Sequence, residues 1–358
     1  MKGNEKYRIL CTTIDKRMHW GSYLIRCRDL KTWADRCATD VEIDLFSHKQ
    51  TRHPKFLEKL NRGLYKATVS IKTPFLNPNH EYGQVFLDVV DDYSVKENSL
   101  QPEMEVIVQN HHHADNIFPN RKSHVVEHWY NSYPEDMMSD EPVFKIPTIK
   151  SVTTLKMATV WTVWANKKDD SCPALEPVFG VSYRCIDRDY LISTWYADVF
   201  NMSISGQQSK IDKILNNPLQ GAGRLYIELF WLYNVLVIPV KFDFQPKLRY
   251  GNVQRAVSQF RSGVPVLLEI YGEVLEEFME QYNYTCAFLR TNTPLPKNTK
   301  RQYWSFEEAT EAMKSPELRQ KCQEEGFQIT KDFFPSEIAK KYLQALGYQG
   351  SFNCGSKH

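Results

Sequence analysis

The sequence has no apolar run long enough to cross a lipid bilayer. Its longest apolar stretch, Phe230–Val240, is about half of the roughly 20 residues that a spanning helix needs. It has no marked excess of charge either, because 45 basic and 43 acidic residues give a net charge of +2. Proteins that bind nucleic acid mainly by electrostatics have a clear basic excess. The sequence therefore argues against a transmembrane segment and against a nucleic-acid partner.

Paired-cysteine motifs and targeting segments are missing as well. None of the eight cysteines belongs to a Cys-x-x-Cys pair, and Cys27 and Cys37 fall within apolar patterns. We expect reduced core cysteines, which are typical of the cytosol, and no metal site. The first residues show no apolar signal-peptide core, so we expect a cytoplasmic protein.

The alternation of apolar strands and amphipathic helices predicts an α/β protein. Arg8–Thr13 and Val41–Phe46 are short apolar runs that suit buried strands. Between them, Tyr23, Cys27, Leu30, Ala34 and Cys37 repeat at helical spacing, with Ser22 as a candidate N-cap. Such a βαβ unit favours a right-handed crossover and a parallel sheet.

A proline-rich and acidic segment, residues 131–150, separates two halves of the chain. At 358 residues, the chain is long enough for two domains with separate cores. Four further apolar segments continue the first half: Ala67–Ile71, Val85–Val90, Glu105–Val108 and His124–Glu127. The second half opens with the predicted strand Lys156–Trp164.

The most informative stretch of the second half is a strand, a basic loop and a helix in succession. Val235–Val240 predicts a buried strand, and a polar loop with Lys241, Lys247 and Arg249 follows it. A short amphipathic helix then ends at Ser262-Gly263, and the next strand starts at Val264-Pro265-Val266. Helices close the chain, with a capping box at Ser305-Phe-Glu-Glu308 and a last helix over about 335–346.

These features together resemble the nucleotide-sugar domain of retaining GT-B glycosyltransferases of the family-4 type (glycosyltransferase group 1). The turn Ser262-Gly263-Val264-Pro265-Val266 is similar to that family's Ala-x-Gly-x-Pro-Val turn. The resemblance implies two Rossmann-like domains with parallel sheets facing across a cleft (GT-B), and a C-terminal helix crossing back. The implied divisions are an acceptor-side domain over 1–140, a donor domain over 141–334, a helix over 335–348 that packs on the first domain, and a flexible tail over 349–358.

The resemblance stops at one pair of residues. The family carries two glutamates eight positions apart that hold the donor sugar and ribose. Counted back from Gly263, those positions hold Tyr250 and Ser258, and neither is a carboxylate.

The loop and helix after the strand could hold the diphosphate of a nucleotide sugar. Negative charge grows on that leaving group, so without a metal the protein must supply cations and N–H donors. Arg255 sits in the first turn of the predicted helix, and its planar fork suits phosphate oxygens; a solvated helix face is the alternative. The donor-side candidates are Lys241, Lys247, Arg249, Asn252, Arg255 and Ser258.

On the acceptor side, the loop after the first strand carries His19, Gly21 and Ser22. The resemblance implies that Gly21 and Ser22 belong to a glycine-bearing acceptor loop. Histidine titrates near neutral pH, so His19 is a candidate catalytic base, although an ordinary surface histidine is the alternative. His111-His112-His113 with Asp115, and Glu127-His128, are possible ligand contacts at strand ends; a plain loop is the alternative.

The predicted function is a glycosyltransferase that uses a nucleotide-sugar co-substrate, with UDP-sugar favoured, and no cofactor. The acceptor and the oligomeric state stay open. One alternative is another GT-B enzyme, such as a nucleotide-sugar epimerase or a DNA glucosyltransferase. The other is a GT-B-like binding or scaffold protein without activity, as the missing glutamates would permit.

Overall fold

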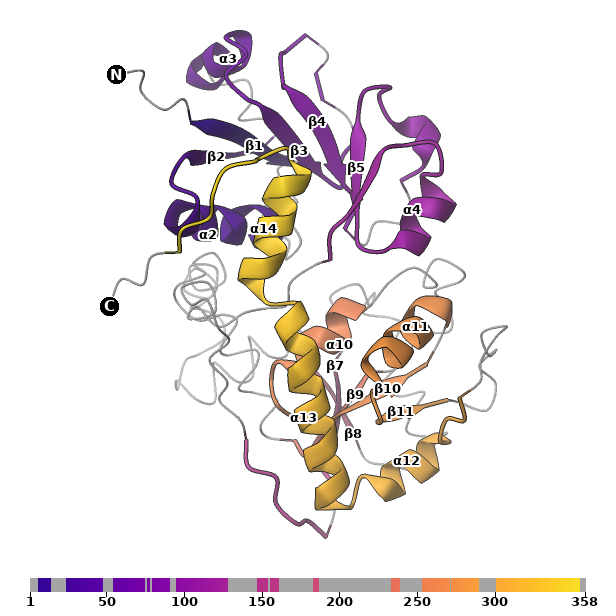
Figure 1. Ribbon diagram of the computed structural model, residues 1–358. Helices are drawn as coiled ribbons and strands as arrows, with labels where there is room; N and C mark the ends of the chain where they lie inside the picture. The colour runs from indigo at the N-terminus through magenta and orange to yellow at the C-terminus, as the bar shows by residue number, and fades with distance from the viewer. Residues whose placement is uncertain are drawn as a thin grey trace, which may run out of the picture. The chain divides into compact units, whose positions relative to one another are not determined.

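The computed structural model describes residues 6–13, 24–47, 54–127 (except 75, 78 and 91–94), 147–160 (except 154), 183–186, 233–238, 253–289 (except 271) and 301–354. The chain forms two compact units (Figure 1). Unit 1 contains Met1–Asn131 and Phe333–His358, and unit 2 contains Pro142–Asp332. Among the described residues, the structure contains no helix with the length and apolar character of a membrane span.

Unit 1 is built on a six-stranded parallel sheet with the order β2-β1-β3-β4-β5-β6. All six strands overlap apolar runs that the sequence analysis predicted, and β2 and β6 are the edge strands. Their bounds are β1 Tyr7–Thr13, β2 Val41–Ser47, β3 Ala67–Ile71, β4 Gln84–Asp88, β5 Glu105–Val108 and β6 Ser123–Val125.

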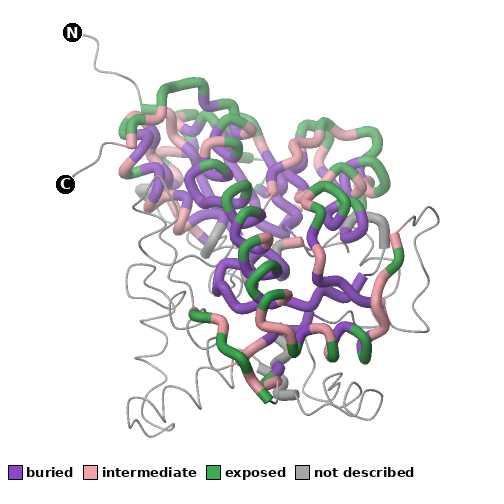
Figure 2. The backbone as a smooth tube through the Cα atoms, turned by 60° about the horizontal axis from the view of Figure 1, so that its bottom comes forward, coloured by how far each residue is buried: buried purple, intermediate pink, exposed green. Residues whose placement is uncertain are grey.

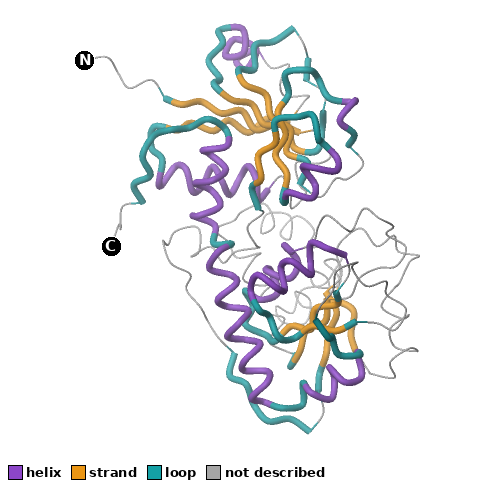
Figure 3. The backbone as a smooth tube through the Cα atoms, turned by 45° about the vertical axis from the view of Figure 1, so that its right-hand side comes forward, coloured by secondary structure: helices purple, strands orange, loops and turns teal. Residues whose placement is uncertain are grey.

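Helices cover both faces of this sheet (Figure 3). Because side chains alternate along a strand, Ile9 and Cys11 of β1 pack with helices α2 (Leu30–Cys37) and α14 (Pro335–Ala345), while Leu10 packs with α3 (Pro54–Asn61). At the β5 side, Val106 and Val108 pack with α4 (His111–Ile117). Unit 1 is therefore a three-layer Rossmann-like sandwich, and its buried residues run through the interior of the unit (Figure 2).

A buried ion pair joins the last helix to this sheet. Asp88 ends β4, and its Oδ2 lies 3.1 Å from Nε of Arg26, with both side chains fully buried. The Tyr342 hydroxyl of α14 donates to the same oxygen at 2.8 Å, and the Arg26 guanidinium lies 4.8 Å from the Tyr342 ring centre. Arg26 also donates to the carbonyls of Val126 and Glu127. The C-terminal helix thus completes the core of unit 1.

Unit 2 has a five-stranded parallel sheet with the order β11-β10-β9-β7-β8. The strands are β7 Met157–Val160, β8 Tyr183–Ile186, β9 Val235–Ile238, β10 Val266–Glu269 and β11 Ala287–Phe288. The helices are α10 Val253–Phe260, α11 Gly272–Tyr282, α12 Phe306–Ala312 and α13 Pro316–Asp332. The predicted capping box of α12 is present, with Ser305 and Glu308 satisfying each other's backbone N–H.

Gly263 makes the turn between α10 and β10. Its φ is +73°, and an added Cβ would lie 2.8 Å from Phe327 and 2.9 Å from Pro147. Its carbonyl accepts a hydrogen bond from Gln323 of α13 at 2.6 Å. A side chain at this position would be strained and crowded, which explains the glycine in the predicted helix-to-strand turn.

The expectation of reduced cysteines is wrong for four of the eight. Cys37 is bonded to Cys354, and Cys286 to Cys322, while Cys11 and Cys27 are free and buried. We expected a flexible tail over 349–358, but the bond to Cys37 holds the tail on unit 1 as far as Cys354. The Phe352 ring packs at a tilt against Trp33 and edge-on against Tyr348, so apolar packing and a covalent bond hold this part of the tail on α2.

We predict that Asp88→Ala lowers the free energy of unfolding of unit 1 by about 3–5 kcal/mol, because it leaves the Arg26 guanidinium buried without its carboxylate. Tyr342→Phe removes one hydrogen bond to a charged group and costs about 2 kcal/mol. Urea titrations followed by circular dichroism measure both. Lys31→Ala, which breaks the exposed Lys31–Asp35 pair, is the control. We expect it to lower the free energy of unfolding by less than about 0.5 kcal/mol. An Asp88→Ala cost as small as that control would contradict the prediction.

The cysteine pairing gives a second prediction. A tryptic digest without reductant yields two cross-linked peptide pairs, one joining Cys37 to Cys354 and one joining Cys286 to Cys322. Iodoacetamide labels Cys11 and Cys27 after unfolding but leaves them unlabelled in the native protein, because both side chains are 0% exposed. Mass spectrometry reads both results, and labelling of all four paired cysteines in the native protein would refute the pairing.

Candidate functional site

Each sheet has one point at which its strand order reverses. In unit 1, β1 lies between β2 and β3; in unit 2, β7 lies between β8 and β9. Both orders are the doubly wound 2-1-3-4-5 arrangement, which unit 1 extends by β6. In open α/β sheets, ligands bind outside the carboxyl ends of the strands at this switch point. The two candidate crevices therefore lie at the ends of β1 and β3, and of β7 and β9.

The sequence candidates follow these strands along the chain. His19, Gly21 and Ser22 come after β1, and Lys241, Lys247, Arg249 and Asn252 come after β9; all seven lie outside the described residues. Arg255 and Ser258 fall within α10, and Arg255 is its third residue. The structure thus gives the strands from which both candidate loops depart.

Lys72 is a described residue at the unit 1 crevice that sequence reasoning missed. It follows β3 directly, is only 6% exposed, and has a left-handed backbone with φ of 54°. Its N–H donates to the Asp88 carbonyl at 2.8 Å, and the Thr13 hydroxyl donates to the Ile71 carbonyl beside it. Val90, after β4, is left-handed too, with φ of 50°. Such backbone is costly for residues other than glycine and is concentrated at functional sites.

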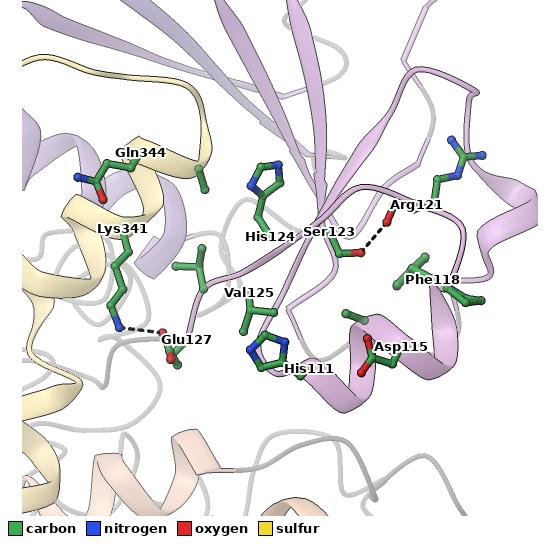
Figure 4. Close-up of a pocket in the computed structure, with 14 residues that line it drawn as sticks. His111, Asp115, Phe118, Arg121, Ser123, His124, Val125, Glu127, Lys341 and Gln344 are labelled. Atoms are coloured by element: carbon green, nitrogen blue, oxygen red, sulfur yellow. Dashed lines mark hydrogen bonds and ion pairs between the residues drawn. The ribbon is translucent and has the colours of Figure 1, made fainter.

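A second feature of unit 1 is a pocket of about 690 Å³ around the edge strand β6 (Figure 4). Its walls come from α4, from the β6 segment and from α14. The labelled side chains include His111 and Asp115 of α4, and Lys341 and Gln344 of α14. Glu127 lies between the walls, and its carboxylate is 3.4 Å from the Lys341 ammonium. Of the residues singled out in the sequence, this pocket brings together His111, Asp115 and Glu127.

The histidine run is helical, not a plain loop. His111, His112 and His113 open α4, and the Asn110 side chain caps it by accepting from the His113 N–H at 2.8 Å. His113 is fully buried, whereas His111 lines the pocket. Within the described part of the chain, no group of three or more His, Cys, Asp or Glu residues could hold a metal ion.

Glu105 of β5 anchors one side of the pocket. Its carboxylate is 2.8 Å from the Lys122 ammonium and 2.5 Å from Nε2 of His124, which lines the pocket. Burial by itself raises the pKa of Glu105, but the hydrogen bonds from Lys122 and His124 outweigh burial and hold the pKa below its usual value. The His124 ring also packs edge-on against Phe86.

No family model and no curated protein matches the chain. Among solved structures, the wall teichoic acid polymerase TagF is similar at 11% identity and a TM-score of 0.37, over 96% of this chain and 90% of that one. The glycosyltransferase AviGT4 of avilamycin A biosynthesis is similar at 10% identity and a TM-score of 0.40, over 96% of this chain and 99% of that one. The pneumococcal O-GlcNAc transferase GtfA is similar at 11% identity and a TM-score of 0.35, over 84% of this chain and 60% of that one.

The ion pairs of Glu105 give a pH-dependent prediction. A lowered pKa means that ionised Glu105 stabilises the fold above the unfolded value of about 4.3, and that this stability is lost as the pH falls through the folded pKa. We expect Glu105→Gln to cost about 1–2 kcal/mol at pH 7, and this cost to decrease as the pH falls through the folded pKa, which lies below the usual value. Urea unfolding at several pH values measures this, with Glu58→Gln at the exposed Glu58–Arg62 pair as control. A cost that stays constant with pH would refute it.

Proposed function

We propose that the protein is a glycosyltransferase that moves a sugar from a nucleotide-sugar donor to an acceptor without a metal ion. The observation that carries the proposal is the repeated sheet order. Each unit has a switch point, and the segments with the predicted donor and acceptor residues follow strands that flank these points. Two Rossmann-like units with a C-terminal helix returning to the first are the architecture that the sequence resemblance implies.

On the donor side, the basic segment after β9 leads into α10. A diphosphate leaving group gains negative charge as the bond to the sugar breaks, and fixed cations and N–H donors stabilise that charge. Lys241, Lys247 and Arg249 supply cations, and the first turn of α10 supplies N–H groups together with Arg255. Asn252, directly before α10, adds a hydrogen-bonding side chain, and Ser258 adds a hydroxyl. A UDP-sugar is the favoured donor.

On the acceptor side, His19 is the proposed base. It removes the proton from the acceptor hydroxyl as that oxygen bonds to the donor sugar, and the nucleoside diphosphate leaves with the electron pair of the broken bond. The resemblance assigns Gly21 and Ser22 to the acceptor side. Lys72, with its left-handed backbone, lies on the β3 side of the crevice.

One observation favours a second candidate, a carbohydrate- or nucleotide-binding protein without transferase activity. Tyr250 and Ser258 occupy the positions where the resembling family has glutamates, and neither supplies a carboxylate to the donor sugar. Release of UDP from UDP-glucose or UDP-N-acetylglucosamine in the presence of acceptor separates the two candidates. A binding protein retains the nucleotide sugar intact.

The donor site gives a direct test by thermal shift. UDP at about 100 times its Kd stabilises the native state by about 2.7 kcal/mol, which raises the melting temperature of a unit of this size by about 5 °C or more. We expect Arg255→Ala to abolish this shift while leaving the melting temperature of the free protein unchanged. Arg62→Ala is the control, because Arg62 is exposed and lies in unit 1. A full UDP shift in Arg255→Ala would remove Arg255 from the donor site.

A further inference from the structure

The pocket at β6 has side chains that are open to a ligand on two opposite walls. His111 and Asp115 lie one helical turn apart on α4, and Gln344 lies on α14. Within the described part of the chain, no hydrogen bond or ion pair satisfies these three side chains. Together they offer a carboxylate that accepts, an amide that donates and accepts, and an imidazole that does both.

The cations of the pocket are already engaged with the protein. The Arg121 guanidinium donates to the carbonyls of Leu100, Gln101 and Pro102, and Lys341 is paired with Glu127. Asp115 therefore lines the pocket as a charged residue that has no counterion among the described residues. An anionic ligand would meet a negative group with no surplus cation, so the charge balance disfavours phosphates and carboxylates.

Apolar ligands and added strands fit the pocket poorly. Phe118 is 1% exposed and Val126 is 2% exposed, so these two apolar side chains offer a ligand little surface. The edge strand β6 is three residues long, which leaves few backbone groups for a peptide strand to pair with. A volume of about 690 Å³ falls in the usual range of small-molecule sites. An uncharged ligand with many hydroxyl groups, each a donor and an acceptor, matches the hydrogen-bonding groups of His111, Asp115 and Gln344.

We propose that this pocket binds a carbohydrate and holds the distal part of a saccharide acceptor; the acceptor role rests on the proposed function. His111 follows β5 and Glu127 follows β6, so one end of the pocket lies at the carboxyl edge of the sheet, where the crevice of β1 and β3 also lies. At about 4.8 Å per strand, β6 lies about 14 Å from β3. A saccharide of several residues spans that distance and a monosaccharide does not.

Saturation-transfer NMR with two trisaccharides, maltotriose and chitotriose, tests the pocket in the full-length protein. We expect saturation transfer to at least one of them, and a fall of at least fivefold in the double variant Asp115→Ala/Gln344→Ala. The matched control Asp35→Ala/Gln320→Ala carries the same two changes at exposed positions outside the pocket and keeps the wild-type signal. Circular dichroism verifies that both variants are folded.

Three results would overturn the proposal. They are no transfer to either trisaccharide, equal transfer in the wild type and the pocket variant, and binding of a (Val-Thr)₃ peptide at β6 in place of the saccharides. The UDP thermal shift separates this proposal from the proposed function, because it does not depend on Asp115 or Gln344. Saccharide binding without any UDP shift would refute the proposed UDP-sugar donor site and leave the carbohydrate pocket standing.

Discussion

The buried contact of Arg26 with Asp88 and Tyr342 is the constraint on which unit 1 depends. Its charges are fully out of solvent, and a buried ion pair is tolerable only with good geometry and further hydrogen bonds. Those bonds come from Tyr342 on the last helix and from two carbonyls just after β6. One guanidinium therefore fixes where β4, β6 and α14 lie relative to one another. Of these elements, β6 and α14 also form walls of the pocket at β6.

Much of the fold could be predicted because buried parallel strands are short, continuous apolar runs. Ala67–Ile71 and Glu105–Val108 have the predicted bounds, and the capping box at Ser305 is confirmed. Helix α4 was missed because its three histidines hide the pattern; Ala114 and Phe118 pack against the sheet and the Asn110 cap starts the helix. The Cys37–Cys354 bond was missed because its ends are 317 residues apart.

Less of the candidate site could be predicted. The order of strand, basic loop and helix predicts a donor segment after β9, and the sheet order shows that β9 flanks the switch point. The pocket at β6 was only partly predicted, since His111 and Glu127 drew attention as strand-end residues. Lys341, the ion-pair partner of Glu127, lies 214 positions beyond it, and no local pattern connects residues so far apart. Lys72 was overlooked because a lysine after a strand is common, and only the backbone conformation distinguishes it.

The return of α14 to unit 1 has a consequence for biosynthesis. Ile338, Tyr342 and Leu343 pack in a core whose members from the N-terminal half are translated more than 200 positions earlier. Domains translated first usually fold first on the ribosome. Unit 1 is an exception, because the N-terminal half emerges with the part of one sheet face that α14 covers still exposed, and its core is completed only when α14 has been translated. A nascent protein stalled before α14 would expose that apolar surface and would be a natural client for chaperones.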